Sequence, residues 1–153
     1  MTQKNTILSV AALLLVGATV TACLDEENPI ITNGDVITRF GATLNGQQEK
    51  PTSTTSTATG TFAGALNETT RVLSYTTTYQ GLTPTGGHLH RINQANGTGP
   101  IDIPFTSLTS PIIGSTTALT TDQVAAMKAG QYYVNLHTAA YPAGEIRGDI
   151  TVR

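Results

Sequence analysis

The sequence predicts an all-β protein, an antiparallel β-sandwich that carries one short helix. Runs of alternating apolar and polar residues recur along the chain between glycine, proline and asparagine turns, as in antiparallel sheets. Charged residues make up 12% of the chain, about half of the roughly 25% usual in globular proteins, which does not suit a helical bundle. Only one segment has the start and stop signals of a helix.

Six strands are expected before the C-terminal hairpin, and turn or loop residues bound each of them. In chain order they cover residues 36–44, 58–66, 71–79, 88–92, 100–105 and 112–119. The second and third flank a four-residue polar turn, so we expect them to form a hairpin. The fifth contains two prolines, which confines it to the edge of a sheet.

The helical signal lies at residues 120–130. Thr120 and Gln123 have the spacing of a capping box, in which each side chain bonds the backbone N–H of the other residue. Lys128 is favourable in the last turn of a helix, and Gly130 is favourable just after the helix ends. We therefore expect a short helix that connects two strands of the sandwich.

Residues 131–150 are expected to form two strands joined by a tight Pro/Gly turn. Successive strand side chains point to opposite faces, which places Tyr132, Val134 and Leu136 on an apolar face that belongs to the core. The opposite face carries a tyrosine, an asparagine and His137.

The chain has three histidines, and they suggest a metal site. His88 and His90 share one face of a predicted strand, while Leu89 between them faces the core. Their backbones are about 6 to 7 Å apart, so both rings can reach one ion, and His137 from a neighbouring strand is the candidate third ligand. Copper or zinc would suit such a set. The alternative is that all three are hydrogen-bonding residues of a sheet face with no metal.

The first 22 residues are expected to be a signal peptide. Lys4 gives a positive start, and the apolar run at residues 7–20 is short for a membrane span. The run ends in the sequence VTAC, which resembles the bacterial lipobox, where the cysteine is lipidated and becomes the first residue of the mature protein. Cys23 is the only cysteine, so no intrachain disulfide forms, and we expect this residue to anchor the protein to a membrane.

Residues 23–35 lack periodicity and are expected to be a flexible tether, which leaves residues 36–153 as the folded domain. The three acidic residues at 25–27 resemble the surface-export signal of lipoproteins in the Bacteroidota, although a solvated linker explains them equally well. These features place the protein in the bacterial cell envelope, with display on the outer-membrane surface as a further option. A net charge of −2 argues against a nucleic-acid partner.

Seven segments of the chain together resemble a known family. In chain order they are Phe40-x-Ala42-x-Leu44-x-Gly46-x-x-Glu49-x-Pro51, Ala58-x-Gly60, Gly81-Leu82-x-Pro84, His88-Leu89-His90, Leu119-x-x-x-Gln123, Ala129-Gly130-x-Tyr132-Tyr133-Val134-Asn135-Leu136-His137-Thr138 and Gly144-Glu145-Ile146-Arg147-Gly148. This pattern, over residues 36–152, resembles the CHRD domain, first described in chordin and common in bacterial secreted proteins. The resemblance implies a Greek-key sandwich of the immunoglobulin-like or superoxide-dismutase-like type, and it implies no activity.

The histidines also resemble those of copper/zinc superoxide dismutase, which uses a strand His-x-His and a later histidine. Three histidines cannot supply both of that enzyme's metal sites, and Cys23 alone cannot form its disulfide, so we do not expect dismutase activity and predict no catalytic residue. One departure from the CHRD pattern is Gly87, where a small residue such as alanine is usual. We expect this glycine to loosen the strand before His88.

Glu145 and Arg147 lie two residues apart on the last predicted strand and therefore share a face. One interpretation is a structural ion pair, with one another or with cross-strand neighbours, that fixes the register of the sheet. The other is that Arg147 lies beside the histidines, behind the metal ligands, and steers anions.

Two functions from different classes fit the sequence. The first is a membrane-anchored extracytoplasmic module that holds copper or zinc through its three histidines. The second is an adhesion or scaffolding module of the cell envelope, in which the histidines are structural and the loops bind a protein or glycan partner.

Overall fold

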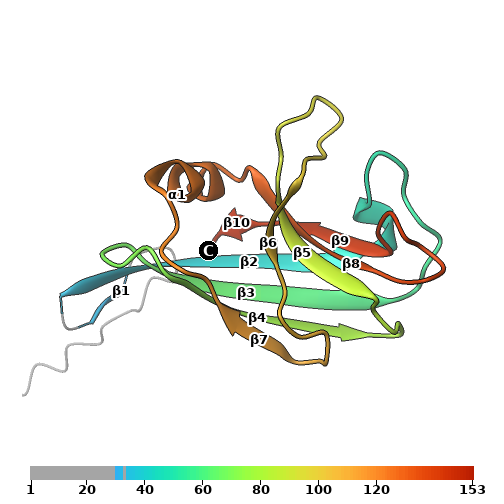
Figure 1. Cartoon of the computed structure of the whole chain (residues 1–153), viewed down its shortest axis with the longest axis horizontal. Helices are drawn as coiled ribbons and strands as arrows, with labels where there is room; N and C mark the ends of the chain where they lie inside the picture. The colour runs from blue at the N-terminus through green and yellow to red at the C-terminus, as the bar shows by residue number, and fades with distance from the viewer. Residues whose placement is uncertain (1–29, 33) are drawn as a thin grey trace, which may run out of the picture.

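The computed structural model describes residues 30–32 and 34–153 (Figure 1). This part of the chain contains ten strands, one α-helix and one 3₁₀ helix. The elements are β1 (Ile30–Thr32), β2 (Asp35–Asn45), η1 (Gly46–Gln48), β3 (Thr59–Asn67), β4 (Leu73–Gln80), β5 (Gly86–Arg91), β6 (Ile101–Pro104), β7 (Ile112–Ser115), α1 (Thr121–Lys128), β8 (Tyr132–His137), β9 (Ile146–Asp149) and β10 (Thr151–Val152).

The strands form one antiparallel sheet that curls into two facing layers. Its order is β6-β5-β8-β9-β2-β3-β4-β7, and β1 and β10 also pair with β2. Strands β9 and β2 meet at a single residue pair, Arg147 with Asn45. The sheet divides there into β6-β5-β8-β9, which we call the histidine layer, and β2-β3-β4-β7, the opposite layer. The two layers cross at an angle (Figure 1), and both contribute side chains to one apolar core.

Strands β4 to β7 form a Greek key. β7 returns beside β4, while β5 and β6 pair with each other in the histidine layer. The loop after β6 joins the layers, because Phe105 N donates to Gly87 O at 3.0 Å and the Tyr79 hydroxyl donates to Leu108 O at 2.6 Å. The predicted all-β sandwich with one short helix is therefore confirmed.

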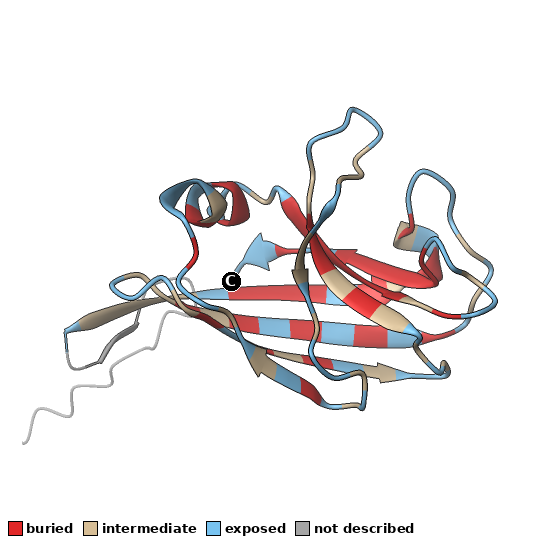
Figure 2. Cartoon of the chain, viewed as in Figure 1, coloured by how far each residue is buried: buried red, intermediate tan, exposed pale blue. Residues whose placement is uncertain are grey.

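Strand alternation sorts the side chains as the sequence predicts. In β3 buried residues alternate with exposed or intermediate ones, and Figure 2 shows them as bands of colour along the strand. Leu89, Tyr132, Val134 and Leu136 have 0% exposure and lie in the core. Strand β8 differs from β3 because all of its residues except His137 are buried, so side chains and loops also cover its outer face.

Helix α1 begins and ends where its sequence signals place it. Thr120 Oγ1 accepts from Gln123 N at 3.1 Å, and Gln123 Oε1 accepts from Thr120 N at 2.9 Å, which completes the capping box. The helix buries Val124, Ala126 and Met127 against the core. Within the described ranges, no helix is long and apolar enough to cross a membrane.

Two segments differ from expectation. Ile30–Thr32, inside the predicted tether, form β1 and pair with the start of β2. The strand predicted at residues 112–119 ends at Ser115, and the chain then runs as a loop that buries Leu119. The signal peptide, Cys23 and the acidic residues behind it lie outside the described residues.

Candidate metal centre

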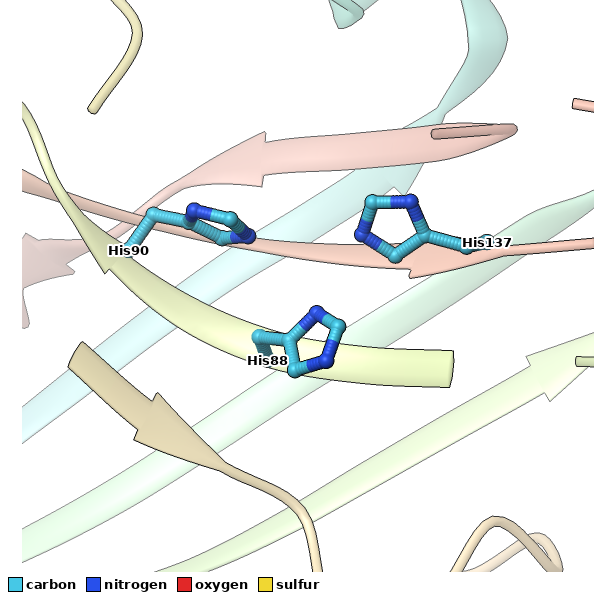
Figure 3. A group of neighbouring side chains, drawn as sticks. All are labelled: His88, His90 and His137. Atoms are coloured by element: carbon cyan, nitrogen blue, oxygen red, sulfur yellow. The ribbon is translucent and has the colours of Figure 1, made fainter. Parts of the chain in front are cut away.

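The three histidines meet on the outer face of the histidine layer. His88 and His90 lie on β5, and His137 ends β8, the strand paired with β5. One ring nitrogen of each lies within 4.8 Å of those of the other two. The ring centroids are 5.0 to 6.2 Å apart, and the rings point toward a common centre (Figure 3). The convergence expected from the sequence is therefore present in the fold.

Backbone carbonyls hold two of the rings through Nδ1. His90 Nδ1 lies 3.0 Å from Gly99 O, and His137 Nδ1 lies 3.0 Å from Pro142 O. A carbonyl oxygen only accepts, so Nδ1 carries the proton in both rings, and each neutral ring then has its lone pair on Nε2. Metal-ligating histidines use their second nitrogen in this way, because the hydrogen bond fixes both the tautomer and the ring orientation.

Two nitrogens of the cluster are buried and lack a partner. Within the described residues, neither His88 Nδ1 nor His90 Nε2 makes a hydrogen bond. An unsatisfied buried polar atom costs about 1–3 kcal/mol, and it is uncommon in native proteins. Zinc and copper bind imidazole nitrogens, so an ion at the centre of the cluster would satisfy both atoms. The donor set thus fits copper or zinc.

The surroundings keep two of the histidines neutral. Burial lowers the pKa of His88 to about 4, and the neighbouring His137 and His90 act in the same direction. Burial also lowers the pKa of His90, although the Gly99 carbonyl opposes this. A metal ion binds the neutral imidazole, so His88 is in the binding form well below neutral pH, and His90 stays in it to a lower pH than an ordinary histidine would.

Asn135 and Glu49 form a buried polar pair beside the histidines. Asn135 is 2% exposed, and its Oδ1 lies 3.1 Å from His137 Nε2. Its Nδ2 lies on the same side as the carboxyl group of Glu49, next to Gly144, and Glu49 comes from the segment after η1. Burial raises the pKa of Glu49 to about 7, against the opposing charge of Arg147. Among the described residues, Glu49 Oε1 has no hydrogen-bond partner.

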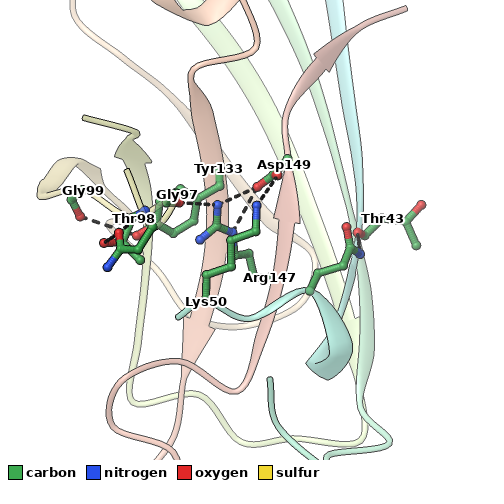
Figure 4. Close-up of polar contacts among 10 residues, drawn as sticks. Thr43, Lys50, Gly97, Thr98, Gly99, Tyr133, Arg147 and Asp149 are labelled. Atoms are coloured by element: carbon green, nitrogen blue, oxygen red, sulfur yellow. Dashed lines mark hydrogen bonds and ion pairs between the residues drawn. The ribbon is translucent and has the colours of Figure 1, made fainter. Parts of the chain in front are cut away.

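Arg147 is fully buried and is linked to the cluster through an aromatic ring. Tyr133 stacks on His90 with 4.7 Å between ring centroids, and the Arg147 guanidinium lies 3.6 Å from the Tyr133 centroid. Arg147 Nε and Nη2 donate to Asp149 Oδ1 at 3.0 and 2.7 Å, and Nη2 also donates to Gly97 O at 2.7 Å (Figure 4). The guanidinium is therefore held in place one ring away from a candidate ligand.

The structure does not pair Glu145 with Arg147. The Glu145 carboxylate instead accepts from Ser56 Oγ at 2.6 Å and from Thr138 Oγ1 at 2.5 Å, which ties two loops together. Arg147 forms its ion pair with Asp149, two residues further along the same strand. Arg147 is one aromatic ring away from His90, whereas the Glu145 carboxylate is bound by Ser56 and Thr138.

The chain was also compared with known protein families. A family model, the CHRD domain, matches residues 40–150. The chain belongs to the CHRD family. The CHRD match contains all three histidines together with Asn135 and Glu49. No curated protein and no solved structure matches the chain.

The sequence identified the histidines of this CHRD domain but not the residues that hold them. Alternation along residues 131–150 placed an asparagine on the histidine face, which was a usable signal for Asn135. Glu49 stood in the CHRD-like pattern, but alternation could not place it beside the histidines, because it reaches the site from a loop far away in the sequence. The carbonyls of Gly99 and Pro142 likewise depend on how two loops fold over the strands.

Proposed function

We propose that this protein binds a copper or zinc ion through His88, His90 and His137, on a CHRD domain that a lipidated Cys23 holds at the bacterial cell envelope. One observation carries the metal-binding part. Carbonyls fix the Nδ1 atoms of two rings, and the cluster contains buried ring nitrogens that have no partner in the described chain. A structural role in the sheet would not require these nitrogens to face one another.

The chain's own residues define what such a site does. His90 and His137 present Nε2 in a fixed orientation, while His88 completes the set from the same face of β5. Zinc would supply a Lewis acid here, and copper would add one-electron chemistry. Three protein ligands leave room for a fourth group on a four-coordinate ion. We assign binding to this site and no catalytic step.

Calorimetric titration of copper(II) and zinc(II) into the full-length protein in detergent tests the proposal. We expect one ion per chain and a loss of at least about 100-fold in affinity for His88→Ala, His90→Ala and His137→Ala. Thr78→Ala, an exposed change on the opposite layer, should bind as the wild type does. If the wild type binds no ion above background, the metal site is wrong, and the adhesion or scaffolding function becomes the better explanation.

The cellular location is a separate part of the proposal. The lipobox-like sequence that ends at Cys23 supports an anchor in a bacterial membrane, and the acidic residues at 25–27 support display on the outer-membrane surface. The membrane is then the partner of the N-terminus, and the domain is free to meet ions outside the cytoplasm.

A further inference from the structure

We infer that Asn135 is the fourth ligand of this centre, through its side-chain oxygen, and that the site therefore selects a divalent ion, zinc(II) or copper(II), over copper(I). The inference rests on the proposed three-histidine site. It adds a specific ligand and a class of ion, and both can be tested separately from metal binding itself.

Asn135 occupies the central position on the histidine face. It pairs directly with His88 in the β5–β8 ladder, and it lies two residues before His137 on the same side of β8. Two ligands with bonds of about 2.0–2.2 Å to one ion are about 2.8–3.6 Å apart when their angle at the ion is near 90–110°. The 3.1 Å between Asn135 Oδ1 and His137 Nε2 falls in this range.

The hydrogen bonds of His137 point to an ion between these two atoms. Its Nδ1 faces Pro142 O and its Nε2 faces Asn135 Oδ1, and both of these oxygens only accept. A neutral imidazole has a single N–H, so one of the two contacts lacks a hydrogen. A metal ion on Nε2 supplies the missing positive centre. A second proton on the ring would also do so, but binding a metal at Nε2 would displace it.

The position of Glu49 indicates which end of the amide faces the histidines. Glu49 Oε1 and Asn135 Nδ2 both lie next to Gly144, and Nδ2 is the only donor of the Asn135 side chain, so the donor end faces the carboxyl group. The glycine at position 144 makes room for the pair, since a Cβ there would come within 2.6 Å of Glu49 Oε1 and 2.8 Å of Asn135 Nδ2. With Nδ2 on the Glu49 side, Oδ1 is directed to the histidine side.

The resulting ligand set is three imidazoles and one amide oxygen. Imidazole suits both zinc and copper, whereas an oxygen ligand is harder and favours divalent ions; copper(I) is selected by soft sulfur ligands. The described part of the site contributes no sulfur atom. We therefore expect the Asn135 oxygen to favour zinc(II) and copper(II) over copper(I). This preference should be stronger than at a site of three histidines alone.

The test compares Asn135→Leu with the double variant Asn135→Asp/Glu49→Gln, in full-length protein in detergent. The leucine removes the oxygen at similar size, whereas the double variant keeps an oxygen at the site and a donor beside it. We expect zinc(II) affinity to fall about 10- to 100-fold in Asn135→Leu and to stay at or above the wild-type value in the double variant. Gln80→Leu, an exposed change on the opposite layer, is the control.

Cobalt(II) as a spectroscopic probe gives a second readout, since the visible spectrum should change in Asn135→Leu and not in the control. A zinc-loaded crystal structure should place Oδ1 within about 2.2 Å of the ion, and it decides the matter if the leucine variant does not fold. Wild-type affinity and spectrum in Asn135→Leu, or Oδ1 beyond bonding distance, would overturn the inference while leaving the three-histidine site intact. A wild type that binds no metal overturns both.

Discussion

At the scale of single residues, burial sets the pH range over which the histidines can hold metal. The pKa of His88 is lowered to about 4 and that of His90 is lowered as well, in both cases mainly by burial. Three ordinary imidazoles would all take up protons below about pH 6.5, and the affinity would then fall by about three decades per pH unit. We expect a shallower fall between pH 6.5 and 5, because the lowered pKa values keep protons off His88 and His90 to lower pH. Competition titrations of zinc across pH 4–8 measure the slope, and a fall of about three decades per unit would contradict the expectation.

Glu49 should make the folded state less stable at high pH. Its pKa is about 7 in the folded chain because of burial, so between about pH 4.5 and 7 the folded state binds a proton that the unfolded state has released. The stability that this bound proton gives to the folded state is fully present below about pH 4.5 and is lost as the pH rises through 7. Glu49→Gln should therefore be more stable than the wild type at pH 8, by on the order of 1–3 kcal/mol.

Urea unfolding at pH 5 and pH 8 tests this expectation, and the gain in Glu49→Gln should shrink at the lower pH. Glu68→Gln is the matched control with the opposite sign. Burial of Glu68 is outweighed by hydrogen bonds from Lys128 and Thr38, which lower its pKa. A gain in Glu49→Gln that is the same at both pH values would show that ionisation of Glu49 is not its source.

At the scale of elements, the capping box should account for a measurable part of the stability of α1. Thr120→Ala removes the acceptor for Gln123 N, and we expect a loss of about 1 kcal/mol in the free energy of unfolding. Thr121→Ala changes the next residue, which is exposed and is not part of the box, so this control should cost little. Urea denaturation of both variants measures the difference, and equal losses would argue against the cap.

Gly87 should resist replacement although Gly86 does not. A Cβ on Gly87 would approach Leu136 Cδ2 to 2.7 Å and Phe105 Cδ2 to 2.8 Å, whereas at Gly86 the nearest atom is 3.4 Å away. The glycine before His88 thus permits close packing of β5, contrary to the looseness expected from the sequence. We expect Gly87→Ala to cost about 1–3 kcal/mol and Gly86→Ala to cost clearly less. Thermal unfolding of the pair checks this, and equal costs would contradict the packing argument.

Local signals predicted most of these elements, and long-range contacts explain the exceptions. The capping box fixed α1, and alternation fixed the core face of β8, because both depend on neighbours in sequence. The burial of Arg147 could not be predicted, because charged residues are usually exposed. Only the fold shows that Tyr133 and Asp149 lie against it. The position of Glu49 beside the histidines could not be predicted either, because it also depends on long-range contacts.

At the scale of the whole molecule, attachment to a membrane should depend on one atom of the N-terminal segment. Cys23→Ser removes the thiol to which lipid would be attached, so the variant should move from the detergent phase to the aqueous phase on phase separation. Membrane fractionation of expressing cells gives the same information. Asp25→Asn is a suitable control, because it lies close by and leaves the thiol unchanged. Unchanged partitioning of Cys23→Ser would contradict the lipoprotein interpretation.

The loop at residues 92–100 is tied to the candidate centre at two points, since His90 bonds Gly99 O and Arg147 bonds Gly97 O. Its own amides close on Gln94 O and Thr98 O inside the loop. The loop cannot lift away without releasing Nδ1 of a candidate ligand. Movement of the loop away from β5 would therefore leave the His90 ring without the contact that fixes its tautomer.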